Sequence, residues 1–170
     1  CLANPEHPDA QNLRESLHTL PHALQQVLAL EDAIKNMPQT QSDSTQLIFL
    51  GKGILYPIAE ETALKVQELA YSPAQAYATG ELKHGPLALV DHNQTCFVLV
   101  NDDATFPLVE SNIHEIAARN GQVVAVATAS TLAKMDPSLL TASIALPDAN
   151  HAITPFTSIV AMQLYAYHHA

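Results

Sequence analysis

The segment Gln46-Leu-Ile-Phe-Leu-Gly-Lys-Gly-Ile-Leu-Tyr-Pro57 combines a short apolar run, two glycines and a proline that can begin a helix. A continuous apolar run, rather than an alternating one, is typical of a strand that is buried on both faces of a parallel sheet. Pro57 suits the first turn of a helix, where its missing N–H is not needed. The segment therefore predicts a strand, a tight loop and a helix, in that order.

Further β-rich runs follow along the chain, and helical patterns separate them. The predicted strands after the first are 95–100, 122–127 and 142–146, with a weaker one at 74–77. The predicted helices are 21–36, 57–71, 104–119 and 151–168, with short turns near 80–85 and 131–136. This alternation predicts an α/β fold: a three-layer α/β/α sandwich with a mainly parallel sheet of about five strands, flavodoxin-like or Rossmann-like.

The chain length of 170 residues is enough for one domain and too short for two of ordinary size. We expect residues 1–12 to be an extension without structure of its own and residues 13–170 to form the domain. Because the sequence begins with Cys1 and stops on an apolar segment, 161–170, we interpret it as a fragment or a processed product.

The charge balance limits the classes of partner. With 17 acidic and 7 basic residues the formal net charge is −10, which disfavours nucleic acids and anionic membranes. No apolar run reaches the roughly 18 residues that a membrane span needs, and no leader pattern is present. The two cysteines make no disulfide framework, and Cys96 lies in an apolar run that suits a buried thiol. These features indicate a cytoplasmic protein.

Two loops follow predicted strands at the sheet edge where ligands bind in folds of this class. The glycines and lysine of Gly51-Lys52-Gly53 can form a phosphate cradle, or only a tight turn. Ile54 and Leu55 stand where a phosphosugar site would present hydroxyls, which weakens the first interpretation. After the strand 95–100, Asp102 and Asp103 come before a helix, where they would cap it and repel a phosphate.

Acidic and basic residues share one stripe of the helix predicted at 57–71. Glu61 and Lys65 are four residues apart, and Lys65 and Glu68 are three apart, so their side chains meet on one face. Such a row is often only a solvated ion-pair network, worth about 0.3–0.5 kcal/mol per pair. The segment 79–86, Thr-Gly-Glu-Leu-Lys-His-Gly-Pro, likewise reads as a short helical turn that Gly85 and Pro86 end. That interpretation does not account for His84.

The same segments resemble a known family. Gly51-Lys-Gly, Tyr56-Pro-Ile-Ala-Glu-Glu-Thr-Ala-Leu-Lys65, Glu68 and Gly80-Glu-Leu-Lys-His-Gly-Pro-Leu-Ala88 are similar to the second sugar-isomerase (SIS) domain of isomerising glutamine:fructose-6-phosphate aminotransferases, the glucosamine-6-phosphate synthases. The similarity runs from about residue 13 to the end of the sequence. The run from Gly80 to Leu89 is a specific rather than a generic part of this similarity.

The resemblance implies a catalytic plan. The acid that matches Glu68 moves a proton between C1 and C2 of the open-chain sugar, turning a ketose imine into a 2-amino aldose. The residue that matches Lys65 stabilises charge on the sugar oxygen, and the one that matches His84 assists ring opening. In the family this histidine reaches the site of a neighbouring subunit, which implies a homodimer.

Parts of the family's complete enzyme have no counterpart in the printed sequence. These are the glutaminase domain, the first SIS domain that holds the sugar phosphate, and the C-terminal tail with the imine-forming lysine. We therefore expect the isolated chain to be inactive in the complete reaction and to act with the first SIS and glutaminase domains. Cys1 could be compared with the glutaminase nucleophile, but Leu2-Ala3-Asn4-Pro5 does not match the start of that domain.

We expect neither a metal nor a cofactor. His18 and His22 have helical spacing, but Pro21 disfavours a helix that contains both, and His168 and His169 point to different sides of a helix. The function that the resemblance implies is the isomerase part of glucosamine-6-phosphate synthesis from fructose 6-phosphate and glutamine. Two alternatives stay open: a stand-alone phosphosugar isomerase or deglycase, and a non-catalytic phosphosugar-binding or dimerisation module.

Overall fold

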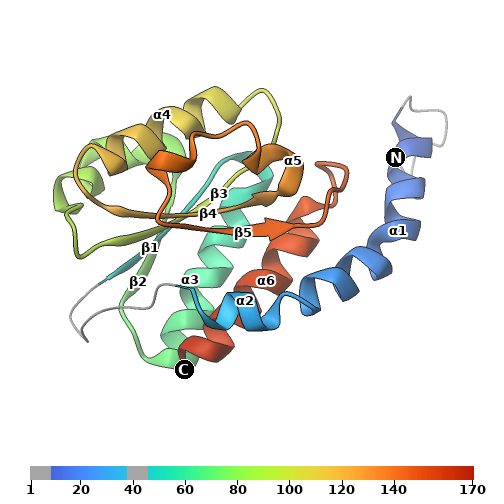
Figure 1. Cartoon of the computed structure of the whole chain (residues 1–170), viewed down its shortest axis with the longest axis horizontal. Helices are drawn as coiled ribbons and strands as arrows, with labels where there is room; N and C mark the ends of the chain where they lie inside the picture. Colours follow the sequence, from blue (N-terminus) through green and yellow to red (C-terminus); the bar gives the residue numbers. More distant parts are fainter. Residues whose placement is uncertain (1–8, 38–45) are drawn as a thin grey trace.

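A five-stranded parallel sheet forms the centre of the computed structural model, which describes residues 9–37 and 46–170 (Figure 1). The strands lie in the order β2-β1-β3-β4-β5, and all four neighbouring pairs are parallel. Their bounds are Leu47–Gly51 (β1), Ala74–Ala78 (β2), Thr95–Leu99 (β3), Gln122–Thr128 (β4) and Ala142–Leu146 (β5). The predicted α/β class is confirmed, and each of the five predicted strands is present.

The central strands are buried on both faces, which explains their continuous apolar runs. Every residue of β1 and β3 is buried, whereas the edge strand β5 alternates between buried and accessible positions. Phe49 of β1 stacks on Phe97 of β3, with ring centroids 5.2 Å apart. Apolar side chains on both faces of these strands hold a helical layer on each side of the sheet.

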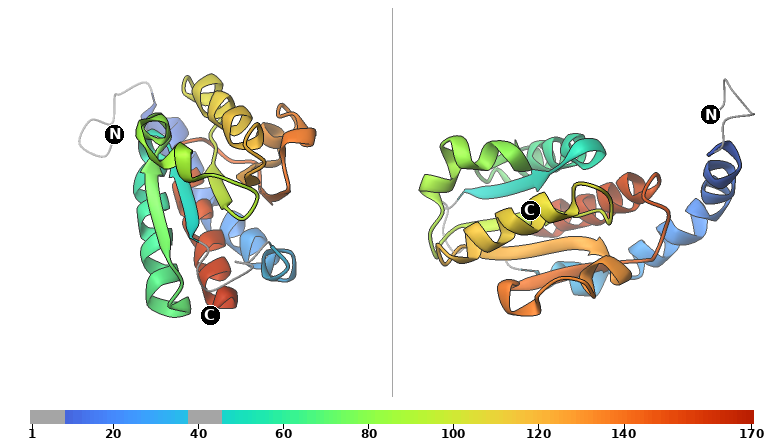
Figure 2. Two further views of the ribbon diagram at one scale, coloured as in Figure 1. Left: turned by 90° about the vertical axis from the view of Figure 1, so that its left-hand side faces the viewer. Right: turned by 90° about the horizontal axis from the view of Figure 1, so that it is seen from above.

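Two helical layers cover the sheet (Figures 1 and 2). On one face, α3 (Tyr56–Ala70) and α6 (Thr154–His169) pack around Phe49, Phe97 and Tyr165, with α2 (Glu31–Lys35) beside α6. The other face carries α4 (Phe106–Ala117), α5 (Ala129–Leu132) and the short 3-10 helices η2 (Thr79–His84), η3 (Pro86–Leu89) and η4 (Pro137–Leu139). The three-layer sandwich is therefore confirmed.

The N-terminal region differs from expectation. Helix α1 (Ala10–Leu28) begins inside the segment expected to lack structure, and it continues through Pro21, so His18 and His22 share one helix. Pro21 cannot donate to the carbonyl of Leu17, but that turn is accessible to water, which can replace the lost donor. Residues 1–8 lie outside the described residues. The N-terminal half of α1 extends beyond the rest of the chain (Figure 1).

The helix predicted at 21–36 is divided in two. A turn at Ala29 and Leu30 separates α1 from α2, and the amide of Ile34 bonds to the carbonyl of Leu30 to start the second helix. Ile34 of α2 is fully buried in the core cluster that includes α6 and the sheet. The second helix therefore packs against the core.

The remaining expectations about the interior concern Cys96 and membrane spans. Cys96 is a free, fully buried thiol in β3, as predicted, and burial raises its pKa to about 12. Within the described ranges, the helices are all too short or too polar to cross a bilayer.

Candidate active site

Helix α3 carries two of the predicted catalytic residues on its outer face. Pro57 stands in its first turn, and the helix ends where Tyr71 takes a left-handed conformation with φ of 53°. Ala59, Ala63 and Val66 face the sheet and are buried, so the periodicity of the helix turns Lys65 and Glu68 toward the solvent side. The predicted stripe of charge is therefore a ridge of α3 on which Glu68 is exposed and Glu61 and Lys65 are partly exposed.

Lys65 is the centre of this ridge. Its Nζ lies 2.6 Å from Oε2 of Glu68 and 3.7 Å from Oε1 of Glu61. The hydrogen bond that it donates to Glu68 raises the pKa of Lys65, with a further rise from the charges of Glu68 and Glu61, although desolvation acts in the opposite direction. The ammonium of Lys65 therefore stays charged at neutral pH, beside the side chain of Glu68.

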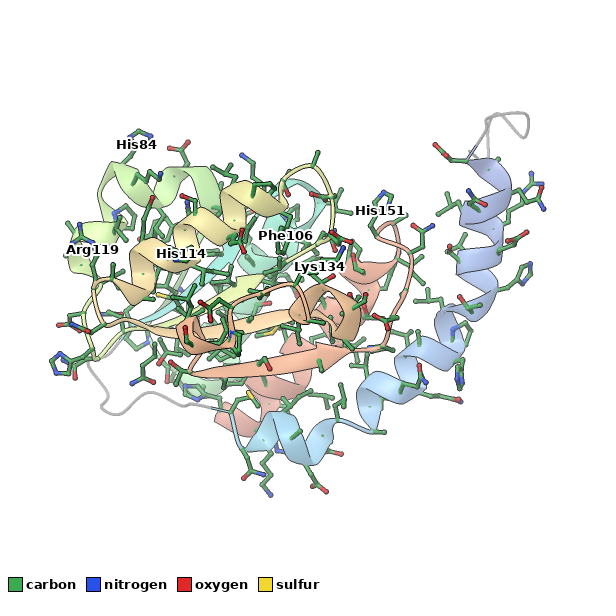
Figure 3. All side chains as sticks on the ribbon, turned by 45° about the horizontal axis from the view of Figure 1, so that its top comes forward. His84, Phe106, His114, Arg119, Lys134 and His151 are labelled. Carbon is green, nitrogen blue, oxygen red and sulfur yellow. The ribbon has the colours of Figure 1, made fainter. Side chains whose placement is uncertain are left out.

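His84 stands at the end of η2, on an exposed turn (Figure 3). Thr79 and Leu82 point inward with the three-residue period of a 3-10 helix, and both are fully buried. Lys83 anchors the turn to α4 through a 2.7 Å ion pair with Glu115. Gly85, with φ of 144°, ends the helix and leaves the imidazole of His84 in solvent.

Within one chain the sheet separates His84 from the other two predicted catalytic residues. Ala63 and Val66 of α3 belong to the core cluster on one face of the sheet, and Leu82 of η2 belongs to the cluster on the other face. The structure therefore brings Lys65 and Glu68 together, and does not bring His84 to them.

The glycine loop before α3 is shaped by close packing. A Cβ on Gly51 would lie 2.3 Å from the carbonyl oxygen of Leu55, so no other residue fits there without a shift of the backbone. Gly53 has a φ of 57°, a backbone conformation that residues other than glycine rarely adopt. Lys52 reaches toward Gly80, where its Nζ would be 3.6 Å from an added Cβ. The glycines are thus accounted for by the turn alone.

The two aspartates after β3 have separate partners. Oδ1 of Asp103 accepts hydrogen bonds from the backbone N and the Oγ1 of Thr105, at 2.7 and 2.6 Å. Asp102 instead accepts from Nζ of Lys134, across the loop. Asp103 therefore shapes the turn that leads into α4 instead of capping the helix itself, and Asp102 is partly neutralised.

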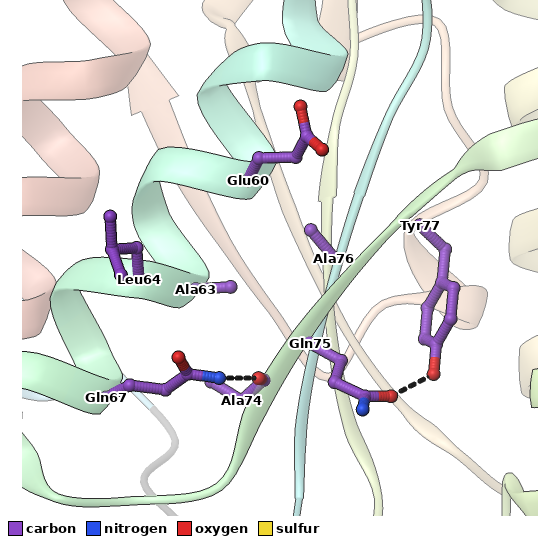
Figure 4. Close-up of a pocket in the computed structure, with 8 residues that line it drawn as sticks. All are labelled: Glu60, Ala63, Leu64, Gln67, Ala74, Gln75, Ala76 and Tyr77. Atoms are coloured by element: carbon purple, nitrogen blue, oxygen red, sulfur yellow. Dashed lines mark hydrogen bonds between the residues drawn. The ribbon is translucent and has the colours of Figure 1, made fainter.

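A groove of about 490 Å³ runs between α3 and the edge strand β2 (Figure 4). Glu60, Leu64 and Gln67 line its helical wall, and Tyr77 closes the opposite side. Nε2 of Gln67 donates a 2.6 Å hydrogen bond to the backbone carbonyl of Ala74, which satisfies part of the strand edge. None of the three predicted catalytic residues lines this groove. Its position depends on a sheet edge, which the sequence pattern did not identify.

A metal site is not formed by the described residues. Across residues 9–37 and 46–170, no group of three His, Cys, Asp or Glu side chains could hold an ion. His18 and His22 share α1, but both are exposed and no third candidate ligand joins them.

Comparisons with known proteins place the chain in a family. The family model described as SIS domain matches residues 42–170. The glutamine–fructose-6-phosphate aminotransferase (isomerizing) of Rhizobium leguminosarum bv. viciae is 39% identical over 163 residues, covering 95% of this chain and 27% of that protein. The enzyme of the same name from Haemophilus ducreyi is 38% identical over 158 residues, covering 93% of this chain and 26% of that protein.

A solved structure shows the same relationship. The C-terminal domain of glucosamine-fructose-6-phosphate aminotransferase from Francisella tularensis matches with a TM-score of 0.86 and 33% identity, covering 92% of this chain and 44% of that one. The chain thus spans about a quarter of the length of the two curated relatives. The fold, the family model and the relatives agree with the resemblance found in the sequence, and the chain belongs to the SIS domain family.

Proposed function

We propose that this chain is the second SIS domain of an isomerising glutamine:fructose-6-phosphate aminotransferase, and that it supplies the groups that move a proton between C1 and C2 of the sugar. One observation carries the proposal: Lys65 and Glu68 form a close pair on an open helical face, in a chain 39% identical to such an enzyme. Residues 13–170 form the proposed domain, although α1 begins at Ala10.

Glu68 acts as the base in this proposal. Its carboxylate takes a proton from C1 of the ketose imine and returns it to C2, which yields the 2-amino aldose. Lys65, held 2.6 Å from that carboxylate, stabilises negative charge that develops on the sugar oxygen. The pair needs a substrate above the outer face of α3, and a neighbouring domain would hold it there.

The first SIS domain is the proposed neighbour on this face. Leu64, Leu69 and Tyr71 are 44%, 44% and 90% exposed, and they accompany Lys65 and Glu68 on and just beyond α3. An apolar surface next to a charged pair fits a contact that excludes water around the reacting atoms. The glutaminase domain of the same polypeptide would supply ammonia. Gly51, Lys52 and Gly53 are a weaker proposal for sugar contacts.

His84 is proposed to act in the site of a second copy. It is exposed, and it lies on the opposite side of the sheet from Lys65 and Glu68, so it fits a role in a neighbouring subunit better than one in its own. There its imidazole would transfer the proton that opens the sugar ring. The proposal therefore includes a homodimer, and a cytoplasmic location where a phosphorylated sugar is available.

A domain exchange tests the proposal. This chain replaces the matching segment of the Rhizobium leguminosarum relative, and glucosamine 6-phosphate formation from fructose 6-phosphate and glutamine is measured. We expect synthesis by the chimaera, with glutamine hydrolysis as the control for intact folding. A chimaera that is dimeric and hydrolyses glutamine but makes no amino sugar would contradict the proposal. Isomerisation of fructose 6-phosphate by the isolated chain would favour the stand-alone isomerase instead.

A further inference from the structure

The turn that carries His84 is oriented by the two residues before it. In a 3-10 helix such as η2, successive side chains are about 120° apart around the axis. Leu82 is fully buried among the apolar residues on this face of the sheet. Lys83 forms its ion pair with Glu115 of α4, and His84 is exposed. The three consecutive side chains therefore point to the core, to α4 and to solvent, and the first two fix the direction of the third.

Glu115 lies on a helix that is held firmly to the sheet. Ile113 and Ile116 of α4 are 1% and 0% exposed, and both belong to the core cluster that includes Leu82. The helices η2 and α4 lie side by side on this face (Figure 3). The Nζ of Lys83 lies 2.7 Å from Oε1 of Glu115. The ion pair therefore attaches the turn to a fixed point of the domain.

This ion pair differs from a fully solvated surface pair. The side chain of Glu115 is only 28% exposed, and its Oε2 is buried with no partner among the described residues. Because that oxygen has lost its contact with water, the carboxylate depends on the ammonium of Lys83 to balance its charge. Movement of Lys83 into solvent would leave a partly buried charge unpaired. The contact between η2 and α4 is therefore a stable one.

The chain after His84 gives the turn less support. Gly85 has a φ of 144°, and a Cβ added to it would meet no atom within 4 Å. The next helix, η3, has no buried residue, and the first buried side chain after His84 is that of Val90. The place of the imidazole is therefore set from the N-terminal side, by Leu82 and by the pair of Lys83 with Glu115.

We propose that Glu115 is a positioning residue, which acts through Lys83 to hold His84 in the direction that sugar ring opening requires. The inference rests on the proposed function, because the role of His84 is taken from it. Glu115 itself does not touch the sugar. Since His84 is proposed to act in the site of a second copy, the contact of η2 with α4 in one subunit would control ring opening in the other.

NMR relaxation of the ¹⁵N-labelled 170-residue chain tests the contact without any sugar. In Glu115→Gln and in Lys83→Met, the order parameters of the His84 and Gly85 amides should fall from about 0.85 to below about 0.6. The amide of Leu82 should stay rigid. Glu110→Gln, the same change elsewhere on α4, is the matched control and should alter none of these values. Unchanged order at His84 in both test variants would overturn the proposal.

Kinetics of the chimaera test the consequence for catalysis. The sugar 5-deoxyfructose 6-phosphate lacks the hydroxyl that closes the furanose ring, so its conversion needs no ring opening. Glu115→Gln should lower kcat/KM about 10–100-fold with fructose 6-phosphate and less than about twofold with the 5-deoxy sugar, because only ring opening needs an oriented His84. A general loss of structure would lower both values alike.

The two measurements separate this inference from the proposed function. Equal losses with both sugars, or parental kinetics in a variant whose His84 has become mobile, would overturn the positioning role of Glu115. A chimaera that makes no amino sugar before any substitution would contradict the proposed function and, with it, the catalytic part of this inference. The relaxation data would still decide whether Glu115 holds the turn.

Discussion

The ammonium of Lys65 donates a 2.6 Å hydrogen bond to the carboxylate of Glu68, one turn further along α3. The two side chains are 30% and 50% exposed, so water screens their attraction. Pairs of this kind contribute about 0–1 kcal/mol to stability. The pair therefore contributes little to the stability of the fold, and both side chains remain accessible to solvent.

Replacement of Lys65 by Met in the chimaera should reduce isomerisation by about 10²–10³-fold, because one preorganised electrostatic contact to the reacting sugar is lost. The free energy of unfolding should change by less than about 1 kcal/mol. Steady-state kinetics and urea denaturation measure the two effects. Lys35→Met, on the exposed surface of α2, is the control. Equal activity in both variants would remove Lys65 from the mechanism.

The two loop glycines should respond differently to alanine. Gly51→Ala places a Cβ 2.3 Å from the Leu55 carbonyl oxygen, so the loop must shift and unfolding becomes easier by about 1–3 kcal/mol. Gly53→Ala meets open space, and only its φ of 57° disfavours it, by about 1 kcal/mol. Urea denaturation of both variants compares them. A smaller effect at Gly51 than at Gly53 would contradict the packing account.

Stability should fall as the pH drops through the ordinary value of 6.5 for histidine, because desolvation lowers the pKa of His169. The unfolded chain then binds more protons than the folded one, so the free energy of unfolding rises with pH in this window. The pKa values of Asp136 and Asp148 are lowered mainly by hydrogen bonds from Ser138 and Ser130. These two carboxylates therefore change the free energy of unfolding only near and below pH 3.8, the ordinary pKa of aspartate.

Urea denaturation between about pH 7.5 and about pH 5.5 isolates the histidine effect. His169→Gln should lose less stability across this window than the parent chain does. His92→Gln, at an exposed position, serves as the comparison. If the His169 variant keeps the slope of the parent chain, another group is responsible.

The Cys96 thiol should not react in the folded chain. With a pKa of about 12 its thiolate fraction near pH 8 is about one in ten thousand, and β3 is fully buried around it. A Cys1→Ser variant treated with a disulfide reagent should therefore be labelled only on unfolding. Rapid stoichiometric labelling under native conditions would show that β3 opens readily.

The sheet was predictable because strands that are buried on both faces have continuous apolar sequences. The runs 46–50, 95–100 and 122–127 are continuous and apolar, and all three became interior strands. The helix through Pro21 was not predictable in the same way, because local preference there favours an interruption. The helix continues because water can donate to the carbonyl of Leu17 in place of the missing N–H of Pro21. This requires the turn to be exposed to solvent, which the sequence alone does not show.

The candidate site was predictable only in part. The spacing of Lys65 and Glu68 placed them on one helical stripe, and the structure pairs them. His84 lies across the sheet because the chain passes from β2 to η2 on the other face. Residue spacing alone does not predict on which face of the sheet a segment lies. The sequence also did not predict the contact of the β3 loop with the start of α6, where Oδ1 of Asn101 accepts a 2.6 Å hydrogen bond from Oγ1 of Thr154.

The most direct test of the central claim uses the chimaera that carries Glu68→Gln. The rate at which hydrogen from the solvent is incorporated at C2 of the sugar is measured. With the reaction run in D₂O, we predict that isomerisation falls by about 10²–10⁴-fold, while fructose 6-phosphate binding and glutamine hydrolysis persist. Glu60→Gln, on the groove side of the same helix, should keep near-parental rates. Parental turnover and deuterium incorporation by the Glu68 variant would contradict its role as the base.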